Sequence, residues 1–336
     1  MPVIAVTEAI AVSKVALEAA NVPPDHAATQ VDLFLDADLR GVPSHGLLRL
    51  PRVIERIRNG VADPRTSGEH DWRSDAFLAV NGRRGLGPVV ANAALKSVAD
   101  KAGKTGIAVA AIGNSNHIGM LGWYAERLAR EGLTTIALST SEALVHPWGA
   151  RRAMIGTNPI AIAVPTGEND PFMMDTATGV VSMGEIHDHA NRGAPIPLGW
   201  ALDGDGNPTT DAAAAKSGAI APFGGPKGYA LGLALELLVT SLAGAAIGRD
   251  VVGTLDSEKV CNKGDVFIVI DGPRHDLRDY LEQLRALEPA EGFGAVLVPG
   301  ERGRACKRQR LVDGVPIADM VWDRIQELAN EHHAAS

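Results

Sequence analysis

The two flanks of the chain show apolar residues at helical spacing, whereas the centre carries short continuous apolar runs. Over residues 7–40 the pattern predicts two helices, separated by the NVPPDH break and capped by Thr7 and Asp25. The buried face of the second helix is expected to hold the apolar residues spaced three or four apart, namely Ala27, Ala28, Val31, Phe34, Leu35 and Leu39. LLRLPRVIERIRNG is expected to continue as helix around Pro51.

Apolar runs bounded by Gly, Pro, Asn and Asp predict strands in the centre. These runs are FLAVNG, TGIAVAAIGN, LTTIALST, NPIAIAVP, PFMMDTA and DVFIVID. Helical patterns follow the first two runs, but none separates the next three, so a partly antiparallel, mixed sheet is expected. The predicted fold class is α/β (α+β). A helical domain is expected from residues 1–75 together with 276–336, and a mixed-sheet domain from residues 76–275.

Two central segments differ from this pattern. Residues 184–225 are rich in turn residues, and we expect a long excursion that serves as a lid or a substrate wall. Residues 229–247 are long enough to span a bilayer. Glu236 lies at their centre, where a carboxylate costs about 3 kcal/mol, so a buried core helix is predicted instead.

Composition limits the partners and the location. Of 336 residues, 46% are hydrophobic and 21% charged, as in an ordinary soluble globule, and the net charge is −8. This charge argues against nucleic acid or an anionic membrane as the main partner. Cys261 and Cys306 give neither a disulfide framework nor a zinc pattern, and MPVIAVTEAI lacks the features of a secretory signal. A cytoplasmic protein is therefore expected.

The usual dinucleotide fingerprint, GxGxxG between a strand and a helix, is not found in the chain. Gly85 and Gly87 form a lone GxG that is more typical of a tight turn. APFGGPKGYALG is more informative, because Pro226 is a natural first helical residue and Lys227 lies in the first turn, where a cation opposes the helix dipole. The segment indicates either a phosphate site or a solvated lysine.

Two histidines stand in positions suited to proton transfer. His117 follows a predicted strand in GNSNHIGMLGWYAERL, and strand ends present side chains at a crevice. His45 has Ser44 beside it and Arg49 four residues on, which places the arginine on the same face if a helix starts there. Imidazole exchanges a proton near neutral pH, and a guanidinium grips a carboxylate. Taken singly, each histidine also fits a structural, hydrogen-bonded role.

Other polar groups give weaker signals. His187 and His189 in EIHDHANR have strand-type spacing for a metal, but no further His or Cys lies at ligand distance, so a solvated turn is favoured and no metal is expected. Asp175 ends the apolar run PFMMDTA. It is a candidate to orient an imidazole, to hold a ribose or to cap a turn.

Taken in order, several long motifs resemble the malate/L-lactate dehydrogenase family, whose members lack a Rossmann domain. The motifs are DADLRGVPSHGLLRLP, GIAVAAIGNSNHIGMLGWYAE, GTNPIAIAVP, DTATG and FGGPKGYALGLALELL. GTLDSEKVCNKGDVFIVID and PFGGPKGY look most like the archaeal-type malate/sulfolactate branch. The resemblance implies a helical domain beside a largely antiparallel, non-Rossmann nicotinamide-binding domain, NAD or NADP as cofactor, and a homodimer.

The resemblance also implies roles at matching positions. His45 and His117 both match proton donors or acceptors assigned in the family, and Arg49, with Ser44 beside it, matches the arginine that holds the substrate carboxylate. The positions that match cofactor-binding residues are Ser141, Asp175, Thr176, Ala177, Lys227 and Gly228, with Gly300 and Glu301 in VPGE expected near them.

Three stretches depart from the family pattern. Met183, Gly184 and Glu185 stand where Arg-Gly-Lys is usual, and Gly179 replaces a serine in DTATG. The usual APFGG appears as HPWGA, so His146 and Trp148 are expected to reshape the pocket. The loss of two cations places cofactor affinity, or the preference for a cofactor phosphate, in question.

These observations lead to one main hypothesis: an NAD(P)-dependent oxidoreductase that interconverts a small 2-hydroxy acid and its 2-oxo acid. Arg52, three residues beyond Arg49, is a candidate to bind a second acidic group, which favours malate or sulfolactate over lactate. The alternatives are a cyclic-imine reductase of the piperideine-2-carboxylate type, a cofactor-binding protein without turnover and, more remotely, a metal-dependent hydrolase built on His187 and His189.

Overall fold

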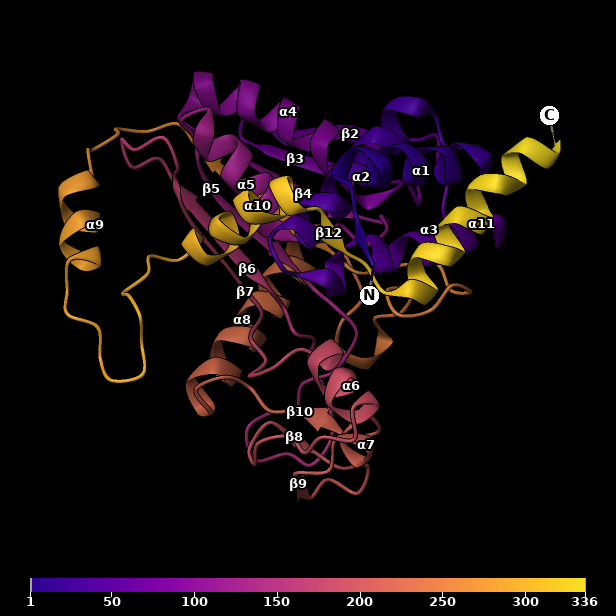
Figure 1. Ribbon diagram of the computed structural model, residues 1–336. Helices are drawn as coiled ribbons and strands as arrows, with labels where there is room; N and C mark the ends of the chain where they lie inside the picture. Colours follow the sequence, from indigo (N-terminus) through magenta and orange to yellow (C-terminus); the bar gives the residue numbers. More distant parts are fainter. Residues whose placement is uncertain (1, 336) are drawn as a thin grey trace.

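A seven-stranded mixed sheet forms the centre of the computed structural model, which describes residues 2–335 (Figure 1). Across the sheet the strands are β2 (Glu69–Ser74), β3 (Phe77–Asn81), β4 (Ile107–Gly113), β11 (Asp265–Ile270), β5 (Thr134–Ser139), β6 (Ile160–Val164) and β7 (Phe172–Thr176). Neighbouring strands are antiparallel except β3 and β4, which are joined by the crossover helix α4 (Gly87–Thr105). The expected mostly antiparallel, mixed sheet is confirmed.

Helices cover both faces of the sheet, and the central strand β11 shows why. Its alternate side chains, Phe267 and Val269, join the apolar cluster that includes α4 and α5 (Leu121–Arg130), whereas Val266 packs with Leu235 and Val239 of α8 (Pro226–Ala243). A strand buried on both sides in this way reads as a continuous apolar run, as DVFIVID does.

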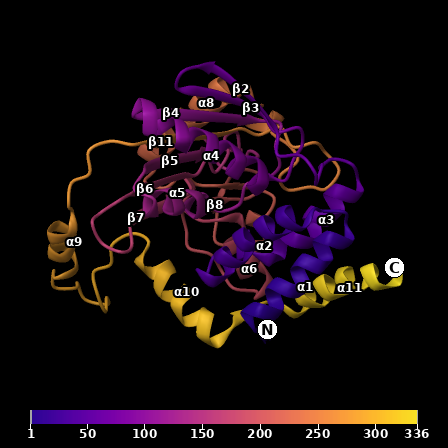
Figure 2. The ribbon, with the colours of Figure 1, turned by 90° about the horizontal axis from the view of Figure 1, so that it is seen from above.

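The two ends of the chain lie together beside the sheet (Figure 2). Helix α1 (Val6–Ala19) packs against α11 (Asp319–Ala335), and β1 (Val3–Ile4) pairs with β12 (Val315–Pro316). Helix α2 (Pro24–Leu39) is covered by α10 (Glu301–Asp313), and α3 (Leu50–Arg58) lies next to α11.

The predicted helix caps were wrong. Helix α1 begins at Val6 and α2 at Pro24, so Thr7 and Asp25 lie inside the first turns, and neither helix has a side-chain cap. Proline takes the first position of α2 because its missing N–H would have no helical partner there.

Ion pairs tie α10 to α2 and α5. The Arg40 guanidinium lies 2.6 Å from both the Asp36 and the Glu126 carboxylates, and Lys307 of α10 also pairs with Asp36. Arg304 of α10 lies 3.7 Å from Glu126. Because Asp36 and Glu126 are almost fully buried, these pairs fix α10 over the end of α2 that leads into the Ser44–His45 segment.

The turn-rich excursion folds as a small lobe rather than as an irregular loop. It contains α6 (Met183–Asn191), α7 (Ala212–Ala215) and the short strands β8 (Ala201–Leu202), β9 (Pro208–Thr209) and β10 (Ala219–Ile220), around an apolar cluster of its own. A second excursion, with α9 (Arg278–Arg285), projects at the left of Figure 1, whereas the small lobe lies at the bottom. The pattern also missed β2, whose six residues are all exposed at the sheet edge.

Helix α8 is held by its central carboxylate. Glu236 is 1% exposed and accepts hydrogen bonds from Gly156 N at 2.9 Å, Asn158 Nδ2 at 2.6 Å and Gly248 N at 2.8 Å. The buried Glu236 carboxylate therefore connects α8 to the segments around it through hydrogen bonds. Within residues 2–335, no helix combines the length and apolarity needed to cross a membrane.

Candidate active site

The Ser44–His45 segment is a tight turn between α2 and α3. It consists of two 3-10 turns, η1 (Pro43–His45) and η2 (Leu47–Arg49), and the Asp38 carboxylate of α2 accepts a hydrogen bond from Leu47 N at 2.7 Å. Ser44 Oγ lies 3.0 Å from His45 Nδ1, and Arg49 Nε donates to the Ser44 carbonyl at 2.7 Å. Ser44, His45 and Arg49 are therefore joined by hydrogen bonds within one turn.

His117 lies in the loop that follows β4. Gly119 N donates to His117 Nδ1 at 3.1 Å, so the neutral imidazole carries its proton on Nε2. A Cβ at Gly87 would lie 2.3 Å from the His117 carbonyl, and one at Gly85 would lie 2.6 Å from Val90. The lone GxG is thus explained by close packing of the start of α4 against the His117 loop.

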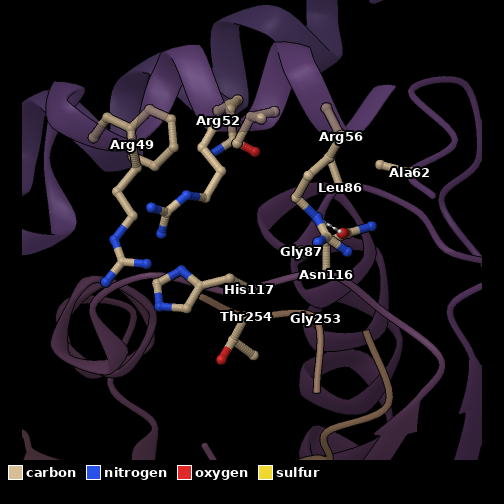
Figure 3. Close-up of a pocket in the computed structure, with 13 residues that line it drawn as sticks. Arg49, Arg52, Arg56, Ala62, Leu86, Gly87, Asn116, His117, Gly253 and Thr254 are labelled. Atoms are coloured by element: carbon tan, nitrogen blue, oxygen red, sulfur yellow. Dashed lines mark hydrogen bonds between the residues drawn. The ribbon is translucent and has the colours of Figure 1, made fainter. Parts of the chain in front are cut away.

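The structure brings the two histidines together. Their ring centroids are 5.5 Å apart and the ring planes are tilted by 31°. His117, Arg49 and Arg52 border one cavity (Figure 3), whose other lining residues are Gln30, Phe34, Val53, Arg56, Ala62, Leu86, Gly87, Asn116, Gly253 and Thr254. His45 does not itself line this cavity, but its ring contacts that of His117, so the two imidazoles and the Arg49 guanidinium lie close together.

Burial and positive charge keep both imidazoles neutral at neutral pH. Desolvation, followed by the Arg49 charge, lowers the pKa of His45 to about 4. Desolvation also holds the pKa of His117 well below its usual value, reinforced by Arg49, His45, Lys263 and Arg52. Burial and the neighbouring Arg52 charge lower the pKa of Arg49 to about 10, which leaves it charged. A cationic, partly dehydrated pocket of this kind favours an anionic ligand.

Three arginines line this pocket at helical spacing: Arg49, which precedes α3, and Arg52 and Arg56 of α3. Arg56 is committed to structure, because its guanidinium donates to Asn116 Oδ1, the Asp256 carbonyl and the Lys259 carbonyl at 2.7–3.0 Å. Arg49 bonds through Nε, which leaves its terminal nitrogens for a ligand, and exposed Arg52 has no bonding partner within residues 2–335. In Figure 3 the side chains of Arg49 and Arg52 both extend toward His117.

The structure links most residues that match cofactor-binding positions. Ser141 Oγ accepts from Thr157 N at 2.9 Å, and the Thr157 carbonyl accepts from Thr178 N at 2.7 Å, directly after Thr176 and Ala177. The Thr178 carbonyl then accepts from Phe223 N at 3.1 Å, just before α8, Lys227 and Gly228. Ser141, the 176–178 segment and the start of α8 are therefore connected.

At the start of α8, glycines let neighbouring groups pack closely against the backbone. A Cβ at Gly228 would lie 1.7 Å from the Phe223 carbonyl, and one at Gly225 would lie 3.0 Å from the Trp148 ring. Trp148, one of the unusual residues of HPWGA, therefore lies beside the helix start. Lys227 is exposed and has no ion-pair or hydrogen-bond partner within the described range. The free backbone N–H groups and this ammonium fit a phosphate.

Three candidates occupy other surroundings. Asp175 Oδ2 accepts from Gly122 N at 2.6 Å and so stabilises the start of α5, and burial raises its pKa to about 6. Gly300 packs on the Met173 carbonyl at the start of α10, and Glu301 binds Arg285 Nε at 2.7 Å. None of the three lines the cavity that contains His117.

The other departures also have local explanations. Ser182 Oγ accepts from Glu185 N at 3.1 Å, so Glu185 belongs to the N-terminal cap of α6, and its carboxylate lies 3.6 Å from His189. A Cβ at Gly184 would lie 3.6 Å from Ser44 Cβ, which places α6 beside the Ser44–His45 turn. Among the side chains that the structure describes, residues 2–331, no cluster of three His, Cys, Asp or Glu is placed to hold a metal.

Sequence reasoning missed three of the residues that shape the pocket. Asn116 donates through Nδ2 to the Arg84 and Gly85 carbonyls and accepts from Arg56, which locks the His117 loop to α3. Thr254 reaches the pocket from a segment that lies almost 140 residues after His117. Arg56 follows Arg49 by two helical turns, a spacing that would have suggested a shared face.

The chain is similar over most of its length to known dehydrogenases. The model of the malate/L-lactate dehydrogenase family matches residues 4–326. The L-sulfolactate dehydrogenase of Methanocaldococcus jannaschii is 37% identical over 319 residues, which cover 93% of this chain and 92% of that protein. A dehydrogenase structure from Sinorhizobium meliloti has a TM-score of 0.94 at 47% identity, covering 98% of each chain. A Δ1-piperideine-2-carboxylate reductase structure from Pseudomonas syringae pvar. tomato has a TM-score of 0.86 at 28% identity, covering 98% of this chain and all of that one.

The depressed pKa of His45 predicts how its removal changes acid stability. A partly exposed but largely desolvated histidine with a folded-state pKa of about 4 stabilises the fold above its unfolded pKa of 6.5, and this contribution is lost as pH falls toward 4. Relative to the wild type, His45→Gln should therefore gain about 2 kcal/mol of unfolding free energy between pH 7 and pH 4. Denaturant titrations at both pH values measure the difference, and an unchanged difference would contradict neutral burial of His45.

Proposed function

Because this chain belongs to the malate/L-lactate dehydrogenase family and is an NAD(P)-dependent 2-hydroxyacid dehydrogenase, we propose roles for its site residues and a preference among substrates. The observation that carries the proposal is the meeting of His45, His117 and Arg49 at one desolvated site. Arg49 binds the C1 carboxylate of the substrate through its terminal nitrogens and so fixes the orientation of C2.

Hydrogen-bond partners suggest different roles for the two imidazoles. The N–H of Gly119 points at His117 Nδ1, so a proton on that nitrogen is disfavoured, and His117 remains neutral and donates from Nε2 to the substrate oxygen. The Ser44 hydroxyl beside His45 Nδ1 can accept as well as donate, so it tolerates an imidazolium. His45 is therefore the better group to take the hydroxyl proton on oxidation and to return it on reduction.

Substrate binding favours this proton transfer. After desolvation, the Arg49 charge is the second cause of the low pKa of His45, and a carboxylate bound to Arg49 neutralises it. The bound substrate thus raises the pKa of the base that serves it.

The nicotinamide cofactor fits the start of α8, where Lys227 and the free N–H groups would hold a phosphate and glycines leave room for close approach. When bound, the cofactor accepts the hydride from substrate C2 or supplies it. We propose Ser141, Thr176, Ala177 and Gly228 as further contacts on the linked path described above, with Asp175 supporting that path through its hold on α5. Gly300 and Glu301 are proposed contacts at the neighbouring β7 edge.

We also propose the domain division and a homodimer. The paired termini and the packing of α1 on α11 support the helical domain of residues 1–75 with 276–336, beside the cofactor-binding domain of residues 76–275, except that β2 (Glu69–Ser74) belongs to the sheet. Two reduced cysteines, one of them buried, are in keeping with a cytoplasmic location. Helix α8 exposes an apolar row of Leu231, Leu237, Leu238 and Leu242, each 37–50% accessible, of a kind that normally marks an interface.

The assembly has a direct test. Light scattering coupled to gel filtration should give twice the chain mass for the wild type, and Leu237→Glu with Leu238→Glu should shift it toward one chain because charges would be buried at the contact. A wild-type mass of one chain would contradict the homodimer.

The activity is tested with a substrate panel. NAD(P)H oxidation is followed with oxaloacetate, sulfopyruvate, pyruvate and piperideine-2-carboxylate, and turnover should be highest with a 2-oxo acid. His45→Gln should lower kcat by about 10²- to 10⁴-fold, the usual contribution of a general acid or base, whereas nucleotide binding by calorimetry should persist. Preference for the cyclic imine would support the reductase alternative, which is retained because the fold also resembles the Pseudomonas reductase structure. Binding without any turnover would contradict the dehydrogenase.

We propose that Arg52 binds a second acidic group of the substrate. It is exposed at the cavity, lacks a partner among the described side chains and lies in the first turn of α3, three residues beyond Arg49. Arg52→Leu should reduce kcat/KM for oxaloacetate or sulfopyruvate by about tenfold or more, the value of one charge-assisted contact, with little effect on pyruvate. Arg58→Leu is the matched control, because it removes a cation of α3 that lies outside the cavity and pairs with Glu331. Equal losses for all three oxo acids would remove the argument for a dicarboxylate or sulfonate substrate.

A further inference from the structure

Asp38 is a buried carboxylate that the reaction scheme above does not use. It lies in the last turn of α2, is 4% exposed and accepts the Leu47 N–H bond at 2.7 Å. Its backbone carbonyl accepts a hydrogen bond from Arg310 of α10. Asp38 therefore contacts the residue that lies two positions beyond His45.

Gly46, the neighbour of His45, is shaped to fit this carboxylate. A Cβ at Gly46 would lie 2.1 Å from Asp38 Oδ1, 2.2 Å from Cγ and 2.4 Å from Oδ2. The backbone angles of Gly46 (φ −91°, ψ −155°) are extended, so conformational freedom does not require glycine here. Contact with the Asp38 carboxylate does require it. Gly46, the glycine of the Ser-His-Gly motif, thus packs directly against the Asp38 carboxylate.

We propose that Asp38 is the positioning residue of the His45 turn, and that its ionised carboxylate fixes the His45 imidazole by holding Leu47 N–H and by seating Gly46. The inference rests on the proposed role of His45. Two residues directly after the imidazole are held by one carboxylate, so weakening this hold displaces the ring from His117 and from the substrate oxygen. A displacement of about 1 Å in such a geometry can cost about 100-fold in rate.

The charge state of Asp38 gives the proposal a distinct signature. Burial raises the pKa of Asp38 to about 7, against the opposing effects of the Leu47 hydrogen bond and the Arg310 charge. Of the other charged groups nearby, Lys307 of α10 pairs with Asp36, Arg49 donates to the Ser44 carbonyl, and His45 is neutral. The ionised carboxylate accepts the stronger hydrogen bond. The turn is therefore held more firmly above pH 7 than below it.

This signature separates Asp38 from the histidines. In the free enzyme the pKa of His45 is about 4 and that of His117 is well below 6.5, so neither titrates near pH 7. Asp175, with a pKa of about 6, is the remaining raised carboxyl near the site, at the start of α5. A rise in kcat/KM through pH 7 in the oxidation direction should then follow Asp38.

The test compares Asp38→Asn with Asp36→Asn, using the full chain, NAD(P)+ and the 2-hydroxy acid of the best substrate in the panel. The asparagine keeps the shape and one acceptor at position 38 but stays neutral. We expect Asp38→Asn to lower kcat by about 10- to 100-fold at pH 8, to leave KM within about threefold, and to lose the rise through pH 7. Asp36→Asn removes a buried carboxylate of the same helix and should keep the wild-type pH profile, whatever its thermal stability.

A second set of variants does not depend on the folding of Asp38→Asn. Gly46→Ala should lower kcat because its methyl group meets the carboxylate, and the loss should be smaller when Asp38→Ala removes that carboxylate. A wild-type kcat in Gly46→Ala, or a wild-type pH profile in Asp38→Asn, would overturn the positioning role. Failure of the wild type to turn over any panel substrate, or full activity in His45→Gln, would instead overturn the proposed function.

Discussion

The site depends on the contact between two tight segments, the turn after α2 and the loop after β4, which sets the imidazoles of His45 and His117 5.5 Å apart. Neither segment belongs to an α-helix or a strand, so each must be held by its neighbours. Asp38 and Gly46 hold the first, while Asn116, Arg56 and the close approach of Gly87 hold the second. Because Arg56 belongs to α3, which begins directly after the His45 turn, the same helix also links the two segments.

Electrostatics follow from this packing. Burial alone disfavours imidazolium, and the guanidinium groups of Arg49 and Arg52 disfavour it further. The free pocket thus combines neutral bases with unneutralised cations, an arrangement whose stability improves when an organic anion enters. The proposed roles of Arg49 and His45 thus couple specificity to proton transfer, because an acidic group bound to Arg49 would also raise the pKa of His45.

The strand order of this sheet differs from that of a Rossmann fold. Strand β11 enters antiparallel between β4 and β5, so its beginning lies at the edge where those two strands end. That edge carries the His117 loop after β4 and Ser141 after β5. In the proposed function, the cofactor phosphate binds not at a glycine-rich loop after the first strand but at the start of α8, beside Trp148. The unusual residues of HPWGA and of Met183–Glu185 lie in the small lobe and at its borders, and Gly184 of α6 lies beside the Ser44–His45 turn.

The sequence by itself determined the strands of the sheet apart from β2, the mixed order of the sheet and the buried helix around Glu236, since apolar periodicity and the absence of intervening helices are local properties. The motifs identified the family and nominated His45, His117 and Arg49. Polar β2, the folded lobe and the unaided starts of α1 and α2 were missed because pairing and packing, not local pattern, stabilise them. Only the tertiary structure showed that Arg56 links α3 to the His117 loop, whereas Arg52 has no partner among the described side chains. It also showed that Asp175 binds the start of α5. Hydrogen-bond partners and desolvation, which decide these roles, come from residues far apart in the chain.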